Sequence, residues 1–238
     1  MQIKILYEDS DILVIDKPSG LMVHSDGKTK EKTITDWILE KYPKLKEVGE
    51  SVFYNSNEIL RPGIVHRLDK ETSGVLLIMK TKEAFDFFKK QFMIHEIKKT
   101  YIAIVSGYIK NEKGKIDKPI GRSPSDFRRR LAGRGARGEL REAVTEYKVL
   151  KRFEDEEGNK FTYLEIYPKT GRTHQIRVHL KYLSYPIVCD TLYAPKNYCP
   201  SKIARLALHA QSVEFKKMNG DVLKIESPVP PSFVDIFS

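Results

Sequence analysis

The sequence has little cysteine and no long apolar run, and each shortage excludes a class of protein. Cys189 and Cys199 are the only cysteines in the chain, too few for a disulfide framework or a four-thiolate zinc site. No run approaches the length of about eighteen apolar residues that a membrane-spanning helix needs. The first residues also lack the apolar block and cleavage site of a signal peptide. We therefore expect a cytoplasmic protein in a reducing setting, with no membrane partner.

Acidic residues are outnumbered by basic ones. The chain has 42 Lys and Arg against 32 Asp and Glu, which gives a net charge of +10. This excess favours a polyanionic partner, because each phosphate that a cation neutralises releases counterions. Hydrophobic residues make up 40% of the chain, enough for a folded core. The composition therefore indicates a folded protein that binds nucleic acid.

The positive charge is concentrated in residues 122–141. Seven arginines lie there against two acidic residues, Asp126 and Glu139. Planar guanidinium groups suit phosphate contact and stacking on bases, and three glycines are expected to make the segment flexible. A solvated surface explains such a run of charge equally well. The candidate nucleic-acid contacts in this segment are Arg128, Arg129 and Arg130.

The hydrophobic pattern predicts several short strands and a few helices. We expect strands at residues 3–7, 12–15, 75–79, 101–105, 143–153, 160–167, 203–216 and 222–225. The first two strands and the last two are each expected to form a hairpin. Helices are expected at 31–42, at 173–183 and after Thr81, which can cap a helix with Phe85, Phe88 and Phe92 on one face. A loop is expected at 41–60, where Pro43, Asn55 and Asn57 are turn signals. The prediction is one α+β domain over residues 1–238, built on a large mixed, mainly antiparallel β-sheet with flanking helices.

One stretch combines the features of a catalytic segment. Residues 63–80 read GIVHRLDKETSGVLLIMK and place Asp69 between His66-Arg67 and Lys70, directly before an apolar run. The surrounding cations favour the ionised carboxylate. Such a group is a poor general base at neutral pH but can act as a nucleophile. The plain alternative for Asp69 is a structural ion pair.

This stretch resembles the catalytic motif of the RluA-type pseudouridine synthases, in which HRLD is followed by a Thr/Ser-Gly turn into a strand. Further segments resemble motifs of the same family in the same order, so that the resemblance covers nearly the whole chain. These segments are Asp16–Gly20 with Val23-His24, Lys99–Gly107, Gly171–His179 and Arg205–Ala210. The resemblance implies the pseudouridine synthase fold and an isomerase that converts uridine in RNA to its C5-glycoside isomer without a cofactor.

The resemblance also implies roles for individual residues. Asp69 would be the nucleophile and would attack either C1′ of the sugar or C6 of the uracil. Arg177 would pair with Asp69 and keep it ionised. Tyr101 would stack on the uracil and serve either as the base for the C5 proton or only as a platform. Leu208 would pack on the other side of the uracil.

Two residues beside Asp69 are expected to contact RNA. The target base must leave its stack before a side chain can reach its reacting atoms. The resemblance implies that Arg67 fills the space which the base vacates, and a phosphate contact is the alternative. His66 would stack on a flipped neighbour or cap the loop.

The chain departs from the family pattern in two places. Cys189 and Ala194 stand where the family often has glycines, which adopt positive φ more readily. The segment before HRLD is also too short for the S4-type RNA-binding domain that many members carry, so we expect no S4 domain. His174 and His179 are five residues apart rather than four, and no metal site is expected.

We therefore expect a monomeric RNA pseudouridine synthase that acts on structured RNA. Large-subunit ribosomal RNA is the favoured substrate, and the tRNA anticodon stem-loop is the alternative. A function of another class, a non-catalytic RNA-binding or ribosome-assembly factor on the same fold, is disfavoured. A binding protein has no use for Asp69, Tyr101 and Arg177 together.

Overall fold

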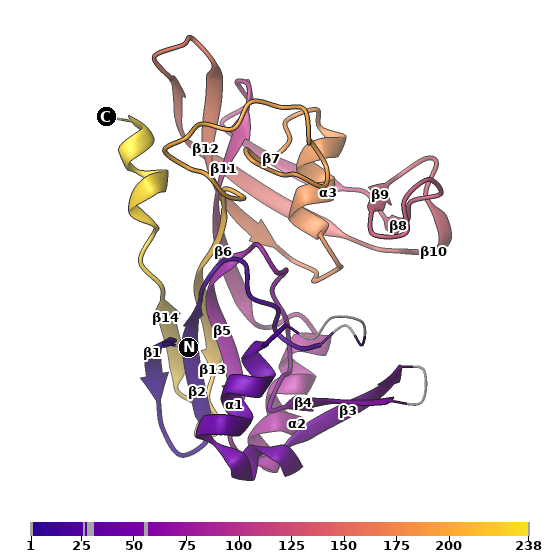
Figure 1. Cartoon of the computed structure of the whole chain (residues 1–238), viewed down its shortest axis with the longest axis vertical. Helices are drawn as coiled ribbons and strands as arrows, with labels where there is room; N and C mark the ends of the chain where they lie inside the picture. Colours follow the sequence, from indigo (N-terminus) through magenta and orange to yellow (C-terminus); the bar gives the residue numbers. More distant parts are fainter. Residues whose placement is uncertain (1, 26, 28–30, 55–56, 238) are drawn as a thin grey trace. The chain divides into compact units, whose positions relative to one another are not determined.

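The computed structural model describes residues 2–25, 27, 31–54 and 57–237 of the chain (Figure 1). The chain forms two compact units, each built from two segments of the sequence. The first unit consists of Met1–Lys98 and Ser212–Ser227, and the second of Lys99–Gln211 and Pro228–Ser238. The assignment of residues 1–238 to one catalytic domain stays a prediction.

The first unit combines a sheet with two α-helices. Its elements are β1 (Lys4–Glu8), β2 (Ile12–Lys17), α1 (Ile34–Lys41), η1 (Pro43–Glu47), β3 (Gly49–Tyr54), β4 (Asn57–Pro62), β5 (Ser73–Met79), α2 (Lys82–Met93), the end of β13 (Leu208–Lys216) and β14 (Val222–Glu226). The strand order is β1-β2-β5-β13, with β14 beside β13. The pairs β1–β2, β2–β5 and β13–β14 are antiparallel, so the predicted hairpins at both ends of this unit are confirmed.

Strand β5 is the centre of the first unit. All seven of its residues are buried, and Phe85 and Phe88 of α2 belong to the same core as the apolar residues of β5. The hydroxyl of Thr81 accepts a hydrogen bond from the N–H of Ala84 (3.2 Å) and caps α2, as predicted. The core thus fixes the strand that directly follows the Asp69 motif.

The prediction of a loop over residues 41–60 is wrong. After η1, strands β3 and β4 pair as an antiparallel hairpin in which Val52 lies opposite Ile59. Pro43 ends α1 and begins η1, and it leaves the next residues able to pair. A Cβ on Gly49 would lie 2.5 Å from the carbonyl oxygen of Arg61, so the hairpin needs glycine there. Asn55, one of the turn signals, lies outside the described residues.

The second unit holds the remaining strands and one α-helix. Its elements are β6 (Lys98–Ser106), β7 (Lys113–Asp117), β8 (Ile120–Arg122), β9 (Arg130–Ala132), β10 (Arg137–Arg141), β11 (Val144–Glu154), β12 (Lys160–Pro168), α3 (Gln175–Tyr182), η2 (Pro231–Phe233) and η3 (Asp235–Phe237). Strands β6, β12, β11 and β7 lie side by side in that order, and each neighbouring pair among them is antiparallel. The predicted strand over 203–216 begins only at Leu208.

Residues 120–141 form a small separate sheet with the order β10-β8-β9, which we call the arginine sheet. The sequence predicted a flexible segment here. The three glycines instead have positive φ, 71° at Gly133, 87° at Gly135 and 74° at Gly138, and they belong to the turn after β9 and to β10. Glycine therefore serves specific turn geometry within a regular element.

The fold class is confirmed as α+β, with a large, mainly antiparallel sheet and flanking helices. None of the described helices is long and apolar enough to cross a membrane.

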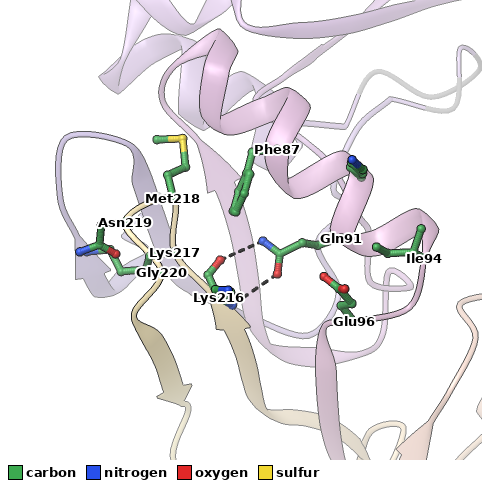
Figure 2. A pocket seen from close by; sticks show the side chains of 10 residues that line it. Phe87, Gln91, Ile94, Glu96, Lys216, Lys217, Met218, Asn219 and Gly220 are labelled. Atoms are coloured by element: carbon green, nitrogen blue, oxygen red, sulfur yellow. Dashed lines mark hydrogen bonds between the residues drawn. The ribbon is translucent and has the colours of Figure 1, made fainter.

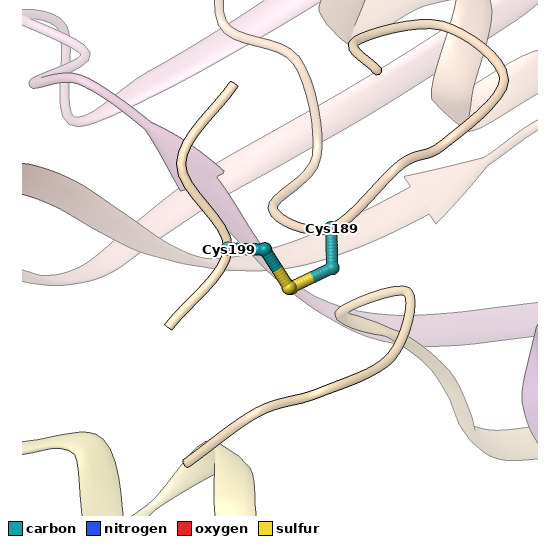
Figure 3. The surroundings of a disulfide bond; sticks show 2 residues. All are labelled: Cys189 and Cys199. Carbon is teal, nitrogen blue, oxygen red and sulfur yellow. A yellow bond between two sulfur atoms is a disulfide. The ribbon is translucent and has the colours of Figure 1, made fainter. Parts of the chain in front are cut away.

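The two cysteines form a disulfide bond, Cys189–Cys199 (Figure 3). The sequence analysis did not anticipate this single bond, and a disulfide is uncommon in the reducing setting that we expected. Cys189 has a φ of 59°, so it adopts the left-handed conformation that the family glycine would supply.

Candidate active site

Asp69 lies in the turn that leads into β5. It is half-buried, and its carbonyl oxygen accepts a hydrogen bond from the N–H of Thr72 (3.1 Å). The side chain of Lys17, at the end of β2, is completely buried. Its Nζ donates to the carbonyl oxygens of Pro18 (2.7 Å), Leu21 (2.8 Å) and Lys70 (3.0 Å). The ammonium group therefore holds the residue that follows Asp69 in place.

The turn after β2 makes further contacts with the same loop. The N–H of Gly20 donates to the carbonyl oxygen of Lys70 (2.9 Å), and the hydroxyl of Ser19 donates to that of Glu71 (2.6 Å). Gly20 has a φ of 85°, a conformation that side chains disfavour. The segment Lys17–Gly20 and the Asp69 loop thus form one hydrogen-bonded unit.

Arg67 is exposed but held by a histidine. Its Nη1 donates to Nε2 of the buried His24 (2.9 Å), and Nδ1 of His24 lies 2.9 Å from the carbonyl oxygen of Ser25. A carbonyl only accepts, so Nδ1 carries the proton and Nε2 is the acceptor. Burial, together with the charges of Arg67 and Arg61, lowers the pKa of His24 to about 4. The neutral imidazole is therefore a stable acceptor for Arg67 at neutral pH.

His66 makes contacts within the first unit. Its Nε2 accepts a hydrogen bond from the N–H of Leu77 in β5 (2.9 Å). Its ring stacks on Phe92 of α2, with 4.6 Å between centroids and 18° between planes. These contacts anchor the start of the HRLD motif to β5 and α2. Stacking on a flipped nucleotide stays a prediction.

Tyr101 and Leu208 belong to the second unit. Tyr101 lies in β6 opposite Ile166 of β12 and is partly buried against the hydrophobic core. Leu208, the first residue of β13, is 3% exposed and is part of the same core. Lys99 precedes Tyr101 by two positions in β6, so their side chains share one face. Burial lowers the pKa of Lys99 to about 8.

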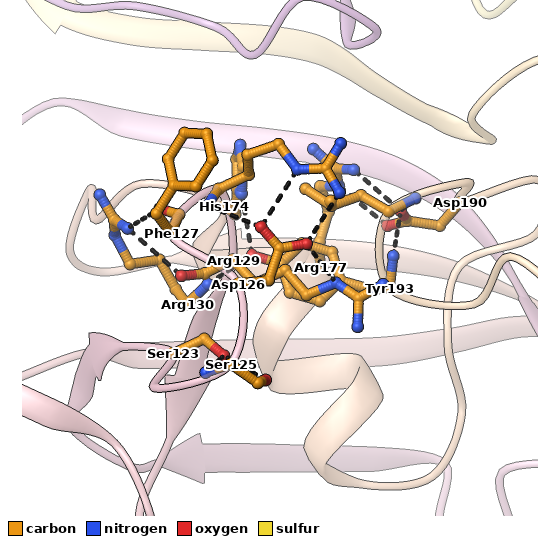
Figure 4. A network of polar contacts seen from close by, with 12 residues as sticks. Ser123, Ser125, Asp126, Phe127, Arg129, Arg130, His174, Arg177, Asp190 and Tyr193 are labelled. Atoms are coloured by element: carbon orange, nitrogen blue, oxygen red, sulfur yellow. Dashed lines mark hydrogen bonds and ion pairs between the residues drawn. The ribbon is translucent and has the colours of Figure 1, made fainter.

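Arg177, in the first turn of α3, forms a buried ion pair that the sequence did not reveal (Figure 4). Its Nε and Nη2 each lie 2.8 Å from a carboxylate oxygen of Asp190. The side chains of Arg177 and Asp190 are 7% and 0% exposed. This two-point geometry fixes the guanidinium plane. The pairing of Arg177 with Asp69 stays a prediction.

Three residues of the arginine sheet were predicted to contact RNA. Arg128 donates to both carboxylate oxygens of Asp126 (3.1 and 2.8 Å), and Nε of Arg129 lies 3.5 Å from the same carboxylate. The hydrogen bonds from the side chain and the N–H of Arg128 lower the pKa of Asp126 to about 2. Nη1 of Arg130 donates to the carbonyl oxygens of Phe127 and Arg129 (3.3 Å each). Phe127, which directly precedes these three arginines in the sequence, is 78% exposed.

Sequence reasoning missed four residues of these arrangements, namely Lys17, His24, Asp190 and Tyr193. Lys17 and His24 lie in segments that resemble family motifs, Asp16–Gly20 and Val23-His24, and Asp190 and Tyr193 lie between Cys189 and Ala194, the two positions that depart from the family pattern. The signal was therefore present, but it did not reveal which atoms each side chain would bind.

The first unit also has a cavity of about 470 Å³ away from these residues (Figure 2). It is lined by α2 and by the turn between β13 and β14. Gln91 forms one side of this cavity. Its Nε2 donates a hydrogen bond to the carbonyl oxygen of Lys216 (2.8 Å), and its Oε1 accepts one from the N–H of Lys216 (3.3 Å). The lining includes none of the predicted site residues. Within the described residues, no group of three or more His, Cys, Asp or Glu side chains could hold a metal ion.

Comparisons with known proteins agree on one family. The family model described as RNA pseudouridylate synthase matches residues 11–182. A Bacillus subtilis protein named uncharacterized RNA pseudouridine synthase YlyB is 35% identical over 237 residues, which cover 99% of this chain and 72% of the relative. A Xanthomonas campestris protein named ribosomal large subunit pseudouridine synthase D is 36% identical over 248 residues, 99% of this chain and 69% of the relative.

Solved structures show the same fold. Human RNA Pseudouridylate Synthase Domain Containing 4 superimposes with a TM-score of 0.71 at 28% identity, over 97% of this chain and 90% of that chain. Human RNA Pseudouridylate Synthase Domain Containing 1 gives a TM-score of 0.75 at 23% identity, over 100% and 88%, and this likeness concerns the fold alone.

Proposed function

The chain belongs to the RNA pseudouridylate synthase family and is an isomerase of uridine in RNA, and on that premise we propose that Asp69 is its nucleophile. One observation carries the proposal. The loop of Asp69 is tied to the turn after β2 through the carbonyls of Lys70 and Glu71. A group that must attack one atom of a bound nucleotide needs such a fixed backbone.

The reaction needs no external reactant. The carboxylate of Asp69 attacks C1′ or C6, and the bond between C1′ and N1 of the uracil breaks. The uracil turns in the pocket, and a bond forms between C5 and C1′. The C5 proton is then lost and N1 gains a proton, so the product is an isomer of the substrate and the carboxylate is regenerated.

Tyr101, Arg177 and Leu208 are proposed to complete the site. Tyr101 supplies a flat face for the uracil and a phenol for the C5 proton. The Nε–Nη2 edge of Arg177 is bound to Asp190. Arg177 is also proposed to pair with Asp69. Leu208 offers an apolar surface to the other side of the base.

Arg67 and His66 are proposed to handle the flipped nucleotide. The hydrogen bond from Arg67 to neutral His24 leaves the full positive charge on the guanidinium and restricts its orientation. An oriented, exposed cation suits the space that a departing base leaves within the RNA. His66 contributes to this step by fixing the start of the motif against β5 and α2.

The arginine sheet is proposed to bind the RNA backbone. Arg128 is 63% exposed in its side chain although it pairs with Asp126. An exposed ion pair is weak, so a phosphate can replace the carboxylate at small cost. Arg129 and Arg130 extend the same positive surface, and the exposed Phe127 offers a ring on which an unpaired base can stack.

The proposed substrate is large-subunit ribosomal RNA, because relatives that match over nearly the whole chain carry that name. The alternative substrate is the tRNA anticodon stem-loop. We further propose that the enzyme acts as a monomer in the cytoplasm. The non-catalytic RNA-binding function is not favoured, since the curated relatives are named as synthases.

Mapping of pseudouridines tests the proposal. RNA is taken from cells that carry the wild-type gene, no gene, or Asp69→Asn, which keeps the size of the side chain and removes the anion. We expect one or more pseudouridines in large-subunit RNA to disappear in the last two strains. If pseudouridines disappeared from tRNA alone, the substrate would be tRNA rather than large-subunit ribosomal RNA. Turnover by purified Asp69→Asn would overturn the proposed nucleophile.

A matched control is Asp86→Asn. Asp86 lies on the exposed face of α2 and pairs with Lys82. This variant removes a carboxylate from the same unit without touching the Asp69 loop. We expect it to retain wild-type turnover, so that any general effect of an Asp-to-Asn change is separated from loss of the nucleophile.

A further inference from the structure

Tyr193 connects two segments of the second unit through its hydroxyl group (Figure 4). The side chain is 7% exposed. Its oxygen lies 2.9 Å from the backbone nitrogen of Arg130, in β9 of the arginine sheet, and 2.8 Å from Nδ1 of His174. His174 directly precedes α3, the helix that carries Arg177. One hydroxyl thus bridges the arginine sheet and the beginning of this helix.

The direction of one of the two hydrogen bonds follows from the groups involved. A backbone N–H only donates, so the N–H of Arg130 must donate to the tyrosine oxygen. In the contact with Nδ1 of His174, the imidazole tautomer decides which group is the donor. Both hydrogen bonds meet at the same hydroxyl group, so its position depends on both segments. A shift of either segment would break at least one of the two hydrogen bonds.

The backbone and ring of Tyr193 contact the buried ion pair. Its N–H donates to Oδ1 of Asp190 (3.0 Å), the oxygen that also accepts from Nη2 of Arg177 (2.8 Å). The Cζ of Arg177 lies 5.1 Å from the centroid of the tyrosine ring. This distance allows a cation–π interaction. Tyr193 therefore touches both partners of the ion pair as well as the arginine sheet.

We propose that Tyr193 is a positioning residue that couples RNA binding by the arginine sheet to the orientation of Arg177. When phosphates fix β9, the N–H of Arg130 fixes the tyrosine hydroxyl, and the tyrosine ring and backbone then hold Arg177 and Asp190. Buried polar groups in a low dielectric depend on each other's geometry more strongly than exposed ones. The inference rests on the roles proposed above for Arg177 and the arginine sheet.

Tyr193→Phe isolates the hydroxyl. The substitution keeps the ring beside Arg177 and the N–H that binds Asp190, and it removes the bridge to Arg130 and His174. Two partly buried polar groups lose a partner, so we expect kcat/KM for a structured RNA to fall about tenfold. The control is Tyr198→Phe in the same loop, whose hydroxyl donates to Glu157 (2.9 Å) at an exposed site. We expect kcat/KM of this variant to equal that of the wild type.

A double-mutant cycle separates coupling from a merely structural effect. The second change is Arg128→Ser, Arg129→Ser and Arg130→Ser together, which leaves the N–H of Arg130 in place. Independent effects multiply, whereas coupled effects do not. We expect the combined loss in kcat/KM to be at least threefold smaller than the product of the separate losses. A combined loss equal to the product, or a Tyr193→Phe variant indistinguishable from Tyr198→Phe, overturns the proposal.

Two further measurements keep the outcome decisive. Amide exchange at Arg130 in the full chain should be faster in Tyr193→Phe than in wild type, and unchanged exchange overturns the bridge.

If Tyr193→Phe melts below the assay temperature, His174→Asn replaces it in the cycle, since asparagine tolerates the φ of 57° at this position. Wild-type RNA affinity of the triple arginine variant would overturn the role of the arginine sheet. A weakened triple variant with multiplicative effects would overturn only the coupling.

Discussion

The loop of Asp69 and the arginine sheet are both proposed to contact RNA, yet the structure holds them in opposite ways. The Asp69 loop precedes a strand with seven buried residues and is bound by the completely buried Lys17. In the arginine sheet all five residues of β10 are exposed. Its arginines pair with neighbours in the same sheet or with exposed carbonyls.

The difference matches the two tasks. A nucleophile needs a fixed backbone, because small displacements of reacting atoms reduce the rate severely. A surface that binds phosphates has to adapt to the RNA and gains little from a deep core. Substitutions in the Asp69 loop should therefore impair stability and chemistry together. Substitutions in the arginine sheet should impair affinity far more than the rate at saturating RNA.

Lys17→Met should have the largest effect. It removes the ammonium donor from three carbonyl oxygens in a buried site, of which that of Lys70 keeps the N–H of Gly20, and we expect the free energy of unfolding to fall by about 3–5 kcal/mol. Turnover of the folded fraction should also drop strongly, because the loop after Asp69 loses its anchor. Urea unfolding and single-turnover kinetics measure both. Lys4→Met, at an exposed position of β1, is the control, and a Lys17 variant as stable as this control would contradict the assigned role.

Arg177→Ala should lower both the stability of the fold and the turnover rate, but less than Lys17→Met does. We expect a barrier higher by about 2–4 kcal/mol, the size seen when one electrostatic stabiliser is lost, and partial rescue by lysine, which lacks the planar fork. The variant also leaves the buried Asp190 without its cation, which should destabilise the fold. Arg177→Met combined with Asp190→Asn should restore stability but not activity. Recovery of turnover in this double variant would show that Arg177 acts only in folding.

Acid should weaken the first unit through His24. Its pKa is about 4 in the folded chain against 6.5 as the ordinary value, so the folded state keeps it neutral. The resulting stability is present above pH 6.5 and is lost as the pH falls from 6.5 through 4, by at most about 3 kcal/mol. Urea unfolding between pH 4 and 7 should show a smaller pH dependence for His24→Asn. His95→Asn, at an exposed position, should leave the wild-type dependence unchanged, and equal curves for both variants would refute the assignment.

The triple change of Arg128, Arg129 and Arg130 to Ser should have the smallest effect on the enzyme itself. We expect unchanged unfolding, and a rate at saturating RNA that falls far less than the affinity. Affinity for structured RNA should fall about tenfold, and the slope of log affinity against log salt should flatten by about 0.7–0.9 per lost phosphate contact. Titrations at several salt concentrations measure this slope. An unchanged affinity and slope would show that these arginines only face solvent.

Local patterns predicted the regular parts of the fold. The strand pair β1–β2, the capped helix α2 and the strands β11 and β12 were expected from alternation, a threonine cap and a phenylalanine face. The hairpin β3–β4 was missed because Pro43 and the asparagines were read as loop signals. Its strands also depend on the pairing of Val52 with Ile59, which no local rule reveals.

The site was predicted as residue types rather than as contacts. The motifs identified Asp69, Tyr101 and Arg177 but not what holds them. Lys17 is an ordinary lysine in the sequence, and its complete burial results from three carbonyls that the fold brings together. Asp190 likewise became a partner of Arg177 only through the packing of α3 against the loop that follows it. Contacts of this kind depend on tertiary structure, which single-sequence patterns do not encode.

The disulfide closes a covalent ring in the chain, and this ring contains two residues that contact Arg177. Cys189 and Cys199 are separated by ten positions, and the ring contains Asp190 and Tyr193. A cross-link of this span removes conformations from the unfolded chain and contributes about 2–3 kcal/mol in the chain-entropy view. The left-handed φ of Cys189 opposes this by about 1 kcal/mol. The ring therefore keeps much of its shape even when its surroundings open, so a reductant should loosen the support of Arg177 before it unfolds the sheet.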